Sequence, residues 1–241
     1  MTVTEMSNEF DVRYNNKTNN EGEGFIPMEK SLLLSYAQEL IFEEYAPIAD
    51  NTIATKDYFN TLKKSATLSP VPSMPGPYPN SWIFYRPADL KYIRASRCNI
   101  VFNENSICHD TGDEEIVTLI KQITEDYYGF NIKNSFKKPY KELLWHLNNG
   151  NEDMFIGDES FTVNKWYLRY YRKFRPIIVR NDDYTTGSIR GYDLASNTLG
   201  LSSEFHEDLH SKIIHKAILI ATKSTKDQLG YQLAALQEKN T

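Results

Sequence analysis

Residues 206–210 read His-Glu-Asp-Leu-His, which matches the H-E-x-x-H signature of zinc metalloproteases. In such enzymes, two histidines four residues apart on one helix face bind a zinc ion. The glutamate between them acts as general base on a zinc-bound water. The five residues therefore raise the hypothesis of a zinc-dependent hydrolase that uses His206, Glu207 and His210.

A zinc site of this kind needs a third protein ligand, and the sequence supplies none at the usual spacing. Residues 211–215 read Ser-Lys-Ile-Ile-His and lack the glycine of the extended motif. The next glutamate along the chain is Glu238, near its end. Short motifs also match by chance. We therefore expect no catalytic, cofactor-binding or metal-binding residues in this chain.

The motif begins a segment, Ser203 to Ala221, whose pattern predicts an amphipathic helix. Ser203 is the expected N-cap, and the acidic residues that follow suit the positive end of a helix dipole. The predicted buried stripe, with His206 and His210 beside it, comprises Phe205, Leu209, Ile213, Ala217 and Ile220.

The remaining composition narrows the class of protein. Cys98 and Cys108 are the only two cysteines, which indicates a reducing compartment and no disulfide framework. Cys108 precedes His109 and Asp110, a fragment that suits a nucleophile or a metal ligand and equally suits an ordinary loop. No apolar run is long enough to span a membrane, so we expect no membrane partner.

Hydrophobic periodicity predicts an α+β fold, with a β-sheet or β-sandwich core, packed N-terminal and C-terminal helices, and extended arms. Residues 116–124 fit either a helix or a strand, and their β-branched side chains favour a strand. The other expected helices cover 28–45, 55–64 and part of 125–136, and the other expected strands cover 82–85, 91–102, part of 139–147 and 161–180.

Two segments are expected to be extended arms or loops. Residues 1–27 are polar, and such a segment does not bury enough apolar area to order itself. We expect an extended N-terminal arm held by a neighbouring subunit or by its own domain. Residues 28–241 are then a single domain, with a Pro-rich loop at 65–80 that lies on a partner or connects two elements.

Basic and aromatic residues alternate along 166–175, a pattern that also suits single-stranded nucleic acid. Arg169, Arg172, Lys173 and Arg175 would contact phosphates in that hypothesis. The formal charge of −5 argues against it and favours a sheet strand with one solvated or subunit-facing side. The acidic runs at 113–115 and 182–183 are expected to be solvated loops.

Several blocks, in order along the chain, resemble the neck or ring proteins of crAss-like bacteriophages. The first is Met1 to Asn16, and Pro87 to Ile93 is similar to the segment that enters the family's central sheet. The others are Glu29–Ser31, Ala37–Glu39, Tyr167–Ile178, Ile189–Gly191 and Leu201–Glu207, followed by Ile213 and Ala217.

The resemblance implies a structural role in the virion. Such proteins form closed rings, usually of twelve subunits, at the head-to-tail junction of a short-tailed phage. The expected partners are copies of the chain itself, the portal protein and other ring and tail proteins. Duplex DNA would pass through the ring without sequence-specific binding. The family carries histidine at the position of His206 without zinc chemistry, and it departs from this chain at Leu201-Ser202-Ser203, where it often has Leu-Pro.

Overall fold

The computed structural model describes residues 1–17, 24–51, 55–71, 78–103, 110, 112–117, 119–134, 136–150, 152–180, 187–194, 196 and 199–224. Their contacts divide the chain into two compact units. Unit 1 combines Met1–Leu62 with Phe174–Thr241, and unit 2 is the continuous stretch Lys63–Lys173. The expected single domain from residue 28 onward is therefore two units, because strands from the middle of the chain pack mainly with one another.

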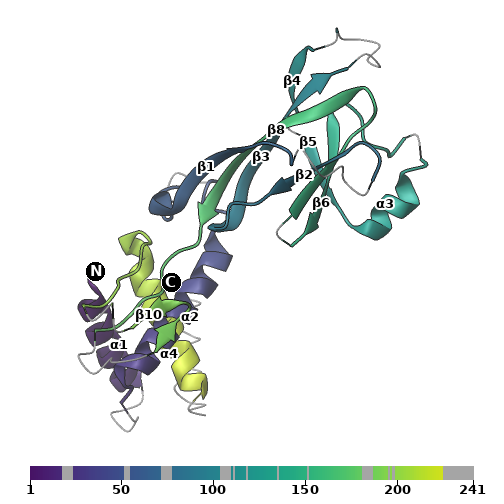
Figure 1. Ribbon diagram of the computed structural model, residues 1–241. Helices are drawn as coiled ribbons and strands as arrows, with labels where there is room; N and C mark the ends of the chain where they lie inside the picture. The colour runs from purple at the N-terminus through teal and green to yellow at the C-terminus, as the bar shows by residue number, and fades with distance from the viewer. Residues whose placement is uncertain are drawn as a thin grey trace. The chain divides into compact units, whose positions relative to one another are not determined.

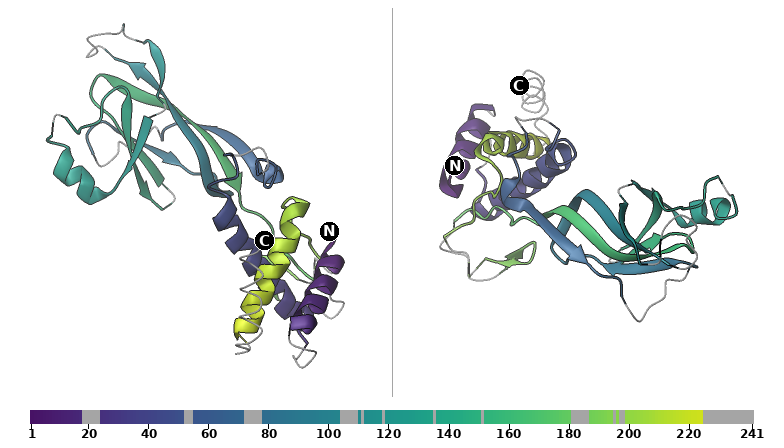
Figure 2. Two further views of the ribbon diagram at one scale, coloured as in Figure 1. Left: turned by 180° about the vertical axis from the view of Figure 1, so that it is seen from behind. Right: turned by 90° about the horizontal axis from the view of Figure 1, so that it is seen from above.

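Unit 1 is built on three helices, α1 (Val3–Lys17), α2 (Pro27–Tyr45) and α4 (His210–Ser224). Helix α4 packs against both α1 and α2, as Figure 2 shows from behind. Helix α2 confirms the helix expected over 28–45. Pro27 occupies its first turn, and the Glu29 carboxylate accepts a hydrogen bond from the backbone nitrogen of Ile26 at 3.0 Å.

The N-terminal segment is a helix where an extended arm was expected. Its apolar residues Val3, Met6, Phe10 and Tyr14 recur at helical spacing and are all buried. Phe10 and Tyr14 also contact the ring of Phe25, with centroids 5.6 and 4.9 Å apart. A polar average composition hid this stripe, and the stripe gives α1 enough apolar surface to dock on its own unit.

Shorter elements complete unit 1. They are the 3-10 helices η1 (Asn60–Leu62) and η3 (Glu207–Leu209), and the hairpin of β9 (Ser188–Ile189) and β10 (Tyr192–Asp193). The helix expected over 55–64 is wrong, since turns and η1 lead directly into a strand. The core here includes a cluster of aromatic rings from four separate segments: Phe42, Phe59, Phe174 and Phe205.

Unit 2 contains two four-stranded sheets (Figure 1). The first sheet has the order β1-β8-β3-β4 and is antiparallel throughout; its strands are β1 (Lys63–Leu68), β8 (Phe161–Arg172), β3 (Leu90–Phe102) and β4 (Glu114–Val117). The second has the order β2-β7-β6-β5, with only β5 and β6 parallel; its strands are β2 (Ser81–Tyr85), β7 (Glu152–Ile156), β6 (Leu143–Asn149) and β5 (Leu119–Ile123).

The two sheets pack face to face, which confirms the β-sandwich expectation. One buried cluster joins Trp166 and Ile100 of the first sheet to Phe84, Leu144 and Phe155 of the second. The other face of the second sheet is covered by α3 (Glu125–Asn131), whose Tyr127 and Tyr128 pack on Trp145. Thr124 caps α3, because its hydroxyl accepts a hydrogen bond from the backbone of Tyr127.

Other expectations divide between confirmed and wrong. Strands at 82–85 and 91–102, strands within 116–124, and a helix within 125–136 are confirmed. The Pro-rich loop expected at 65–80 begins inside β1, and its residues 72–77 lie outside the described part. The acidic residues Glu114 and Glu115 lie on β4 instead of a loop, whereas 182–183 fall outside the described residues. Among the helices that are described, none is long and apolar enough to cross a membrane.

Candidate functional site

The two motif histidines do not share a helix face. His206 lies before η3, is exposed, and its Nδ1 accepts a hydrogen bond from the backbone of Asp208 at 3.3 Å. His210 is the first residue of α4 and is buried, and its Nε2 donates to the carbonyl of Phe205 at 3.1 Å. The H-E-x-x-H geometry requires both rings on successive turns of one helix, and here the first histidine precedes the helix.

The predicted start of this helix is therefore too early. Ser203 does not cap α4; its hydroxyl accepts a hydrogen bond from the backbone of Phe205. The chain bends there because the ring of Phe205 enters the aromatic cluster of unit 1. The predicted buried stripe otherwise holds, except that Ile220 is only half-buried.

The surroundings of His210 keep its imidazole neutral. Burial lowers the pKa of His210 below its ordinary value, and the nearby amino terminus lowers it further. The Glu207 carboxylate points elsewhere and lies 3.3 Å from the Met1 amino group. Over the described part of the chain, no three His, Cys, Asp or Glu residues are grouped to hold a metal ion. The hydrolase hypothesis thus loses its geometric basis.

The other candidate ligands give no site within the part of the chain that the structure describes. Cys98 is buried, and burial raises the pKa of its thiol, so it is an inert core residue. Cys108 and His109 lie outside the described residues, as does Glu238.

The four basic residues of the nucleic-acid hypothesis do not form one surface. Arg169 is exposed on the outer face of the first sheet. Arg172 donates to the carbonyl of Lys173, and the Lys173 amine donates to the carbonyl of Ala88, each at 2.9 Å. Arg175 belongs to unit 1, where it forms an ion pair with Glu204 at 3.2 Å. Three of the four are thus used to fix the chain's own fold.

Helix α2 uses one polar stripe to hold the segment that returns from unit 2. The Ser35 hydroxyl accepts from the backbone nitrogen of Ile177 and donates to its carbonyl, at 3.0 and 2.9 Å. Ser31 accepts from the backbone of Val179, and Gln38 donates to the carbonyl of Arg175. These three polar side chains, at helical spacing, satisfy backbone groups of an extended segment in which Ile178 pairs with Leu201 through a two-way backbone bridge.

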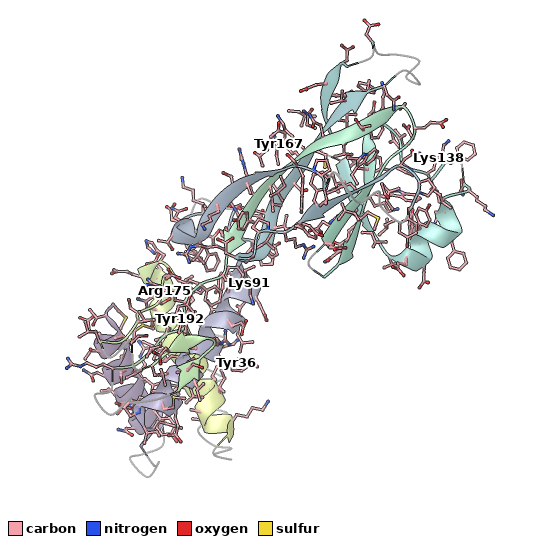
Figure 3. All side chains as sticks on the ribbon, viewed as in Figure 1. Tyr36, Lys91, Lys138, Tyr167, Arg175 and Tyr192 are labelled. Atoms are coloured by element: carbon pink, nitrogen blue, oxygen red, sulfur yellow. The ribbon has the colours of Figure 1, made fainter. Side chains whose placement is uncertain are left out.

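Another side of α2 exposes apolar side chains. Leu32 and Tyr36 are about half-exposed, and Ile26 just before the helix is exposed as well. Figure 3 labels Tyr36 on this side of the helix. This surface is called the outer face of α2 below.

Unit 2 holds a buried ion cluster that the sequence did not reveal. The Asp153 carboxylate on β7 is fully buried, and both Nε and Nη2 of Arg86 bind it, the latter at 2.6 Å. His146 on β6 donates to it from Nε2 at 2.5 Å and stacks on Phe155. Burial alone would raise the pKa of Asp153, but the hydrogen bonds from His146 and Arg86 outweigh it and lower the pKa. The cluster ties β6, β7 and the residue that follows β2 together.

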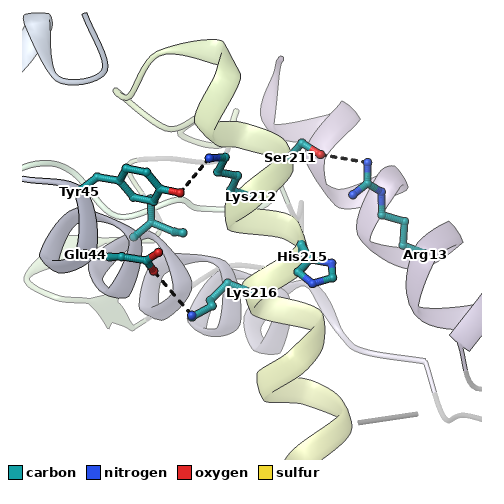
Figure 4. Close-up of a pocket in the computed structure, with 8 residues that line it drawn as sticks. Arg13, Glu44, Tyr45, Ser211, Lys212, His215 and Lys216 are labelled. Carbon is teal, nitrogen blue, oxygen red and sulfur yellow. Dashed lines mark hydrogen bonds and ion pairs between the residues drawn. The ribbon is translucent and has the colours of Figure 1, made fainter. Parts of the chain in front are cut away.

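A hollow of about 220 Å³ lies between the three helices of unit 1 (Figure 4). The cationic side chains that line the hollow contact polar or acidic partners within unit 1. Lys212 donates to the hydroxyl of Tyr45 at 2.8 Å, and Arg13 donates to Ser211 at 3.1 Å. Lys216 lies 3.7 Å from Glu44. The side chains around the hollow therefore join the three helices to one another.

Comparison with known sequences identifies the family to which the protein belongs. A sequence model of one family, phage tail ring protein 3/4, matches residues 1–232. The chain belongs to this family of crAss-like phage tail ring proteins. The chain is also 27% identical over 247 residues to "Ring protein 4/5" of Bacteroides phage crAss001, covering 95% of each sequence. The protein is thus a virion structural ring protein of a crAss-like phage, which confirms the resemblance.

In this ring protein, the segments that carried the resemblance meet in space. Lys30 binds Asp11 at 2.5 Å, which joins α2 to α1. Arg190 in the β9–β10 turn binds Glu39 at 2.5 Å. In unit 2, Asp89 binds Tyr170 at 2.9 Å. Each of these three contacts joins two of the blocks within one unit. The spacing of the blocks along the sequence does not show these contacts.

Proposed function

We propose that this ring protein forms a closed ring of twelve copies at the head-to-tail junction of a short-tailed phage. Its neighbours would be the portal protein and other ring and tail proteins, and duplex DNA would leave the capsid through it. The chain would be made in the cytoplasm of the host cell and end in the neck of the virion. The family match over residues 1–232, which spans both units, carries this proposal.

The outer face of α2 supports assembly through protein contacts. Apolar surface of this kind on a folded unit marks an interaction site more often than a solvated one. Identical subunits that close into a ring meet through two different surfaces, one on each side of the subunit. Leu32, Tyr36 and Ile26 would supply one such surface.

The charge supports a passive role toward DNA. Proteins that grip duplex DNA use lysine and arginine to neutralise phosphates, and this chain has a net charge of −5. An acidic ring would repel the duplex and let it slide. The role is that of a conduit and not of an enzyme, since the motif histidines have no shared ligand geometry.

Purified virions test the proposal directly. Quantitative mass spectrometry should give one copy of this chain per copy of portal protein, and cryo-electron microscopy should place a twelve-fold ring at the neck. Absence of the chain from virions, or a location on the capsid shell, would refute the proposal. A different ratio to the portal would refute the twelve-fold assignment alone.

A further inference from the structure

Within residues 130–141, the described residues form a basic, aromatic surface on unit 2, here called the tip. The segment contains four lysines and no acidic residue, in a protein whose net charge is −5. Phe136 is 100% exposed and Phe130 is 84% exposed. Lys133, Lys137 and Lys138 are exposed too, and Figure 3 labels Lys138 near α3.

The tip is a defined structure. The backbone nitrogens of Lys137 and Lys138 both bond to the carbonyl of Asn134. Pro139 is buried, and Tyr140 pairs with Leu143 through a two-way backbone bridge. A surface that is ordered before binding loses little conformational entropy on docking. Lysines near the end of a helix are explained by the helix dipole, but two fully or mostly exposed phenyl rings are not.

A surface of matching character lies on another part of unit 2. Within residues 110–119, here called the acidic edge, the described residues include four acidic side chains and no basic one: Asp110, Asp113, Glu114 and Glu115. Ile116 and Leu119 are 56% and 57% exposed beside them. Strand β4 is the last strand of the first sheet, so one side of it has no strand neighbour among the described residues.

We propose that the tip of one copy docks on the acidic edge of the next copy around the ring. Exposed lysines of the tip would meet carboxylates of the acidic edge, and each charged set lies in the same segment as exposed apolar side chains, so charge and hydrophobic contact both complement. Figure 1 draws α3 and β4 at separate places in unit 2, and a contact between two different surfaces of identical subunits runs head to tail. The proposal rests on the proposed ring function and names one of its interfaces.

Duplex DNA is a weaker partner for the tip. Phosphate binding would use the lysines, but it gives no role to Phe130 and Phe136. It would also place the tip toward the DNA in a chain whose net charge repels the duplex. The acidic edge offers carboxylates for the lysines of the tip and exposed apolar side chains for its two phenylalanines.

Charge-reversal variants test the contact between the tip and the acidic edge, because combining them should restore it. The tip variant carries Lys137→Glu and Lys138→Glu, and the edge variant carries Asp110→Lys and Glu115→Lys. Each is supplied from a plasmid to a phage whose own copy of the gene is inactivated. Alone, each variant places like charges in every contact, and we expect infectious particles to fall on the order of a hundredfold.

Supplied together, the two variants restore opposite charges at every contact of an alternating ring. An even number of subunits is needed for such a ring to close, and twelve satisfies this. The four substitutions in one chain restore the contact as well. We expect both arrangements to recover particle yield to within about tenfold of the wild type. The matched control, Lys56→Glu with Lys223→Glu, makes the same charge change at exposed positions of unit 1 and should leave the yield unchanged.

The outcomes separate this interface from the ring itself. Three outcomes would overturn the contact if wild-type virions still contain the chain. They are a normal yield from either variant alone, no rescue by the pair, and a loss equal to that of the control. Lower duplex affinity of the tip variant without rescue by the edge variant would assign the tip to DNA instead. Absence of the wild-type chain from virions would remove the proposed function and this contact together. Thermal melts confirm that each variant folds.

Discussion

Replacing Asp153 with asparagine should destabilise unit 2 without touching its surface. The substitution keeps the shape of the side chain and removes its charge, which leaves Arg86 without its buried counter-charge. Breaking a buried ion pair in this way costs about 3–5 kcal/mol. The Arg86 side chain is 21% exposed, so water relieves part of the penalty. We therefore expect the low end of that range, about 3 kcal/mol.

Tryptophan fluorescence can follow this unit alone, because all three tryptophans lie within residues 63–173. Urea unfolding of Asp153→Asn should show a lower midpoint than the wild type. Glu159→Gln, an exposed substitution in the turn that follows β7, is the matched control and should change stability by less than about 0.5 kcal/mol. A loss below about 1 kcal/mol in Asp153→Asn would refute the reasoning, because such a value is typical of a neutral hydrogen bond.

The same carboxylate also sets an acid limit. The folded pKa of Asp153 is lowered, so its stabilisation is present above the unfolded pKa of about 3.9 and is lost as pH falls through the folded value. The Asp153→Asn variant should lose this part of the acid dependence. An identical acid limb in both proteins would mean that Asp153 is not charged in the folded state.

Three further predictions concern unit 1 and are measured by far-UV circular dichroism. Phe10→Ala should cost about 3–5 kcal/mol, whereas Val12→Ala on the exposed side of α1 should cost less than about 0.5 kcal/mol; equal effects would mean that α1 is not docked. Ser35→Ala should cost about 1–3 kcal/mol, because a buried amide and carbonyl lose their partner, and a neutral effect would contradict this. His210 has a lowered folded pKa, so stability should fall as the pH drops below about 6.5, and His210→Gln should flatten that limb; a limb unchanged in the variant would assign it to another group.

Periodicity predicted the elements that have one clear apolar face. Strand β3 and helix α2 follow directly from their residue patterns, whereas those patterns leave both a β-sheet and a β-sandwich core open. The sequence did not predict that Asp153 would be buried, because its hydrogen-bonding partners Arg86 and His146 lie 67 and 7 residues away. Pairings over such separations are decided by topology, which a local pattern does not contain.

Two errors had local causes. The average polarity of residues 1–27 predicts an extended arm, whereas the helical spacing of Met6, Phe10 and Tyr14 indicates α1. The helix at His206 was placed early because the serine and acidic residues resemble a cap. Tertiary packing of Phe205 instead keeps the chain non-helical until residue 207. Local propensity is a weak guide where an aromatic anchor competes with it.

The division of the chain has a consequence for synthesis on the ribosome. Unit 2 is continuous and can fold as soon as residue 173 has emerged, but unit 1 needs both ends of the chain. Helices α1 and α2 pack against α4, and α2 also binds the stretch 174–179. Both partners leave the ribosome after unit 2, so these packing contacts form late in synthesis. The outer face of α2 is therefore supported only once the chain is nearly finished. Truncated chains would then carry a folded sandwich and no stable helical unit, so premature products are poorly suited to enter the ring.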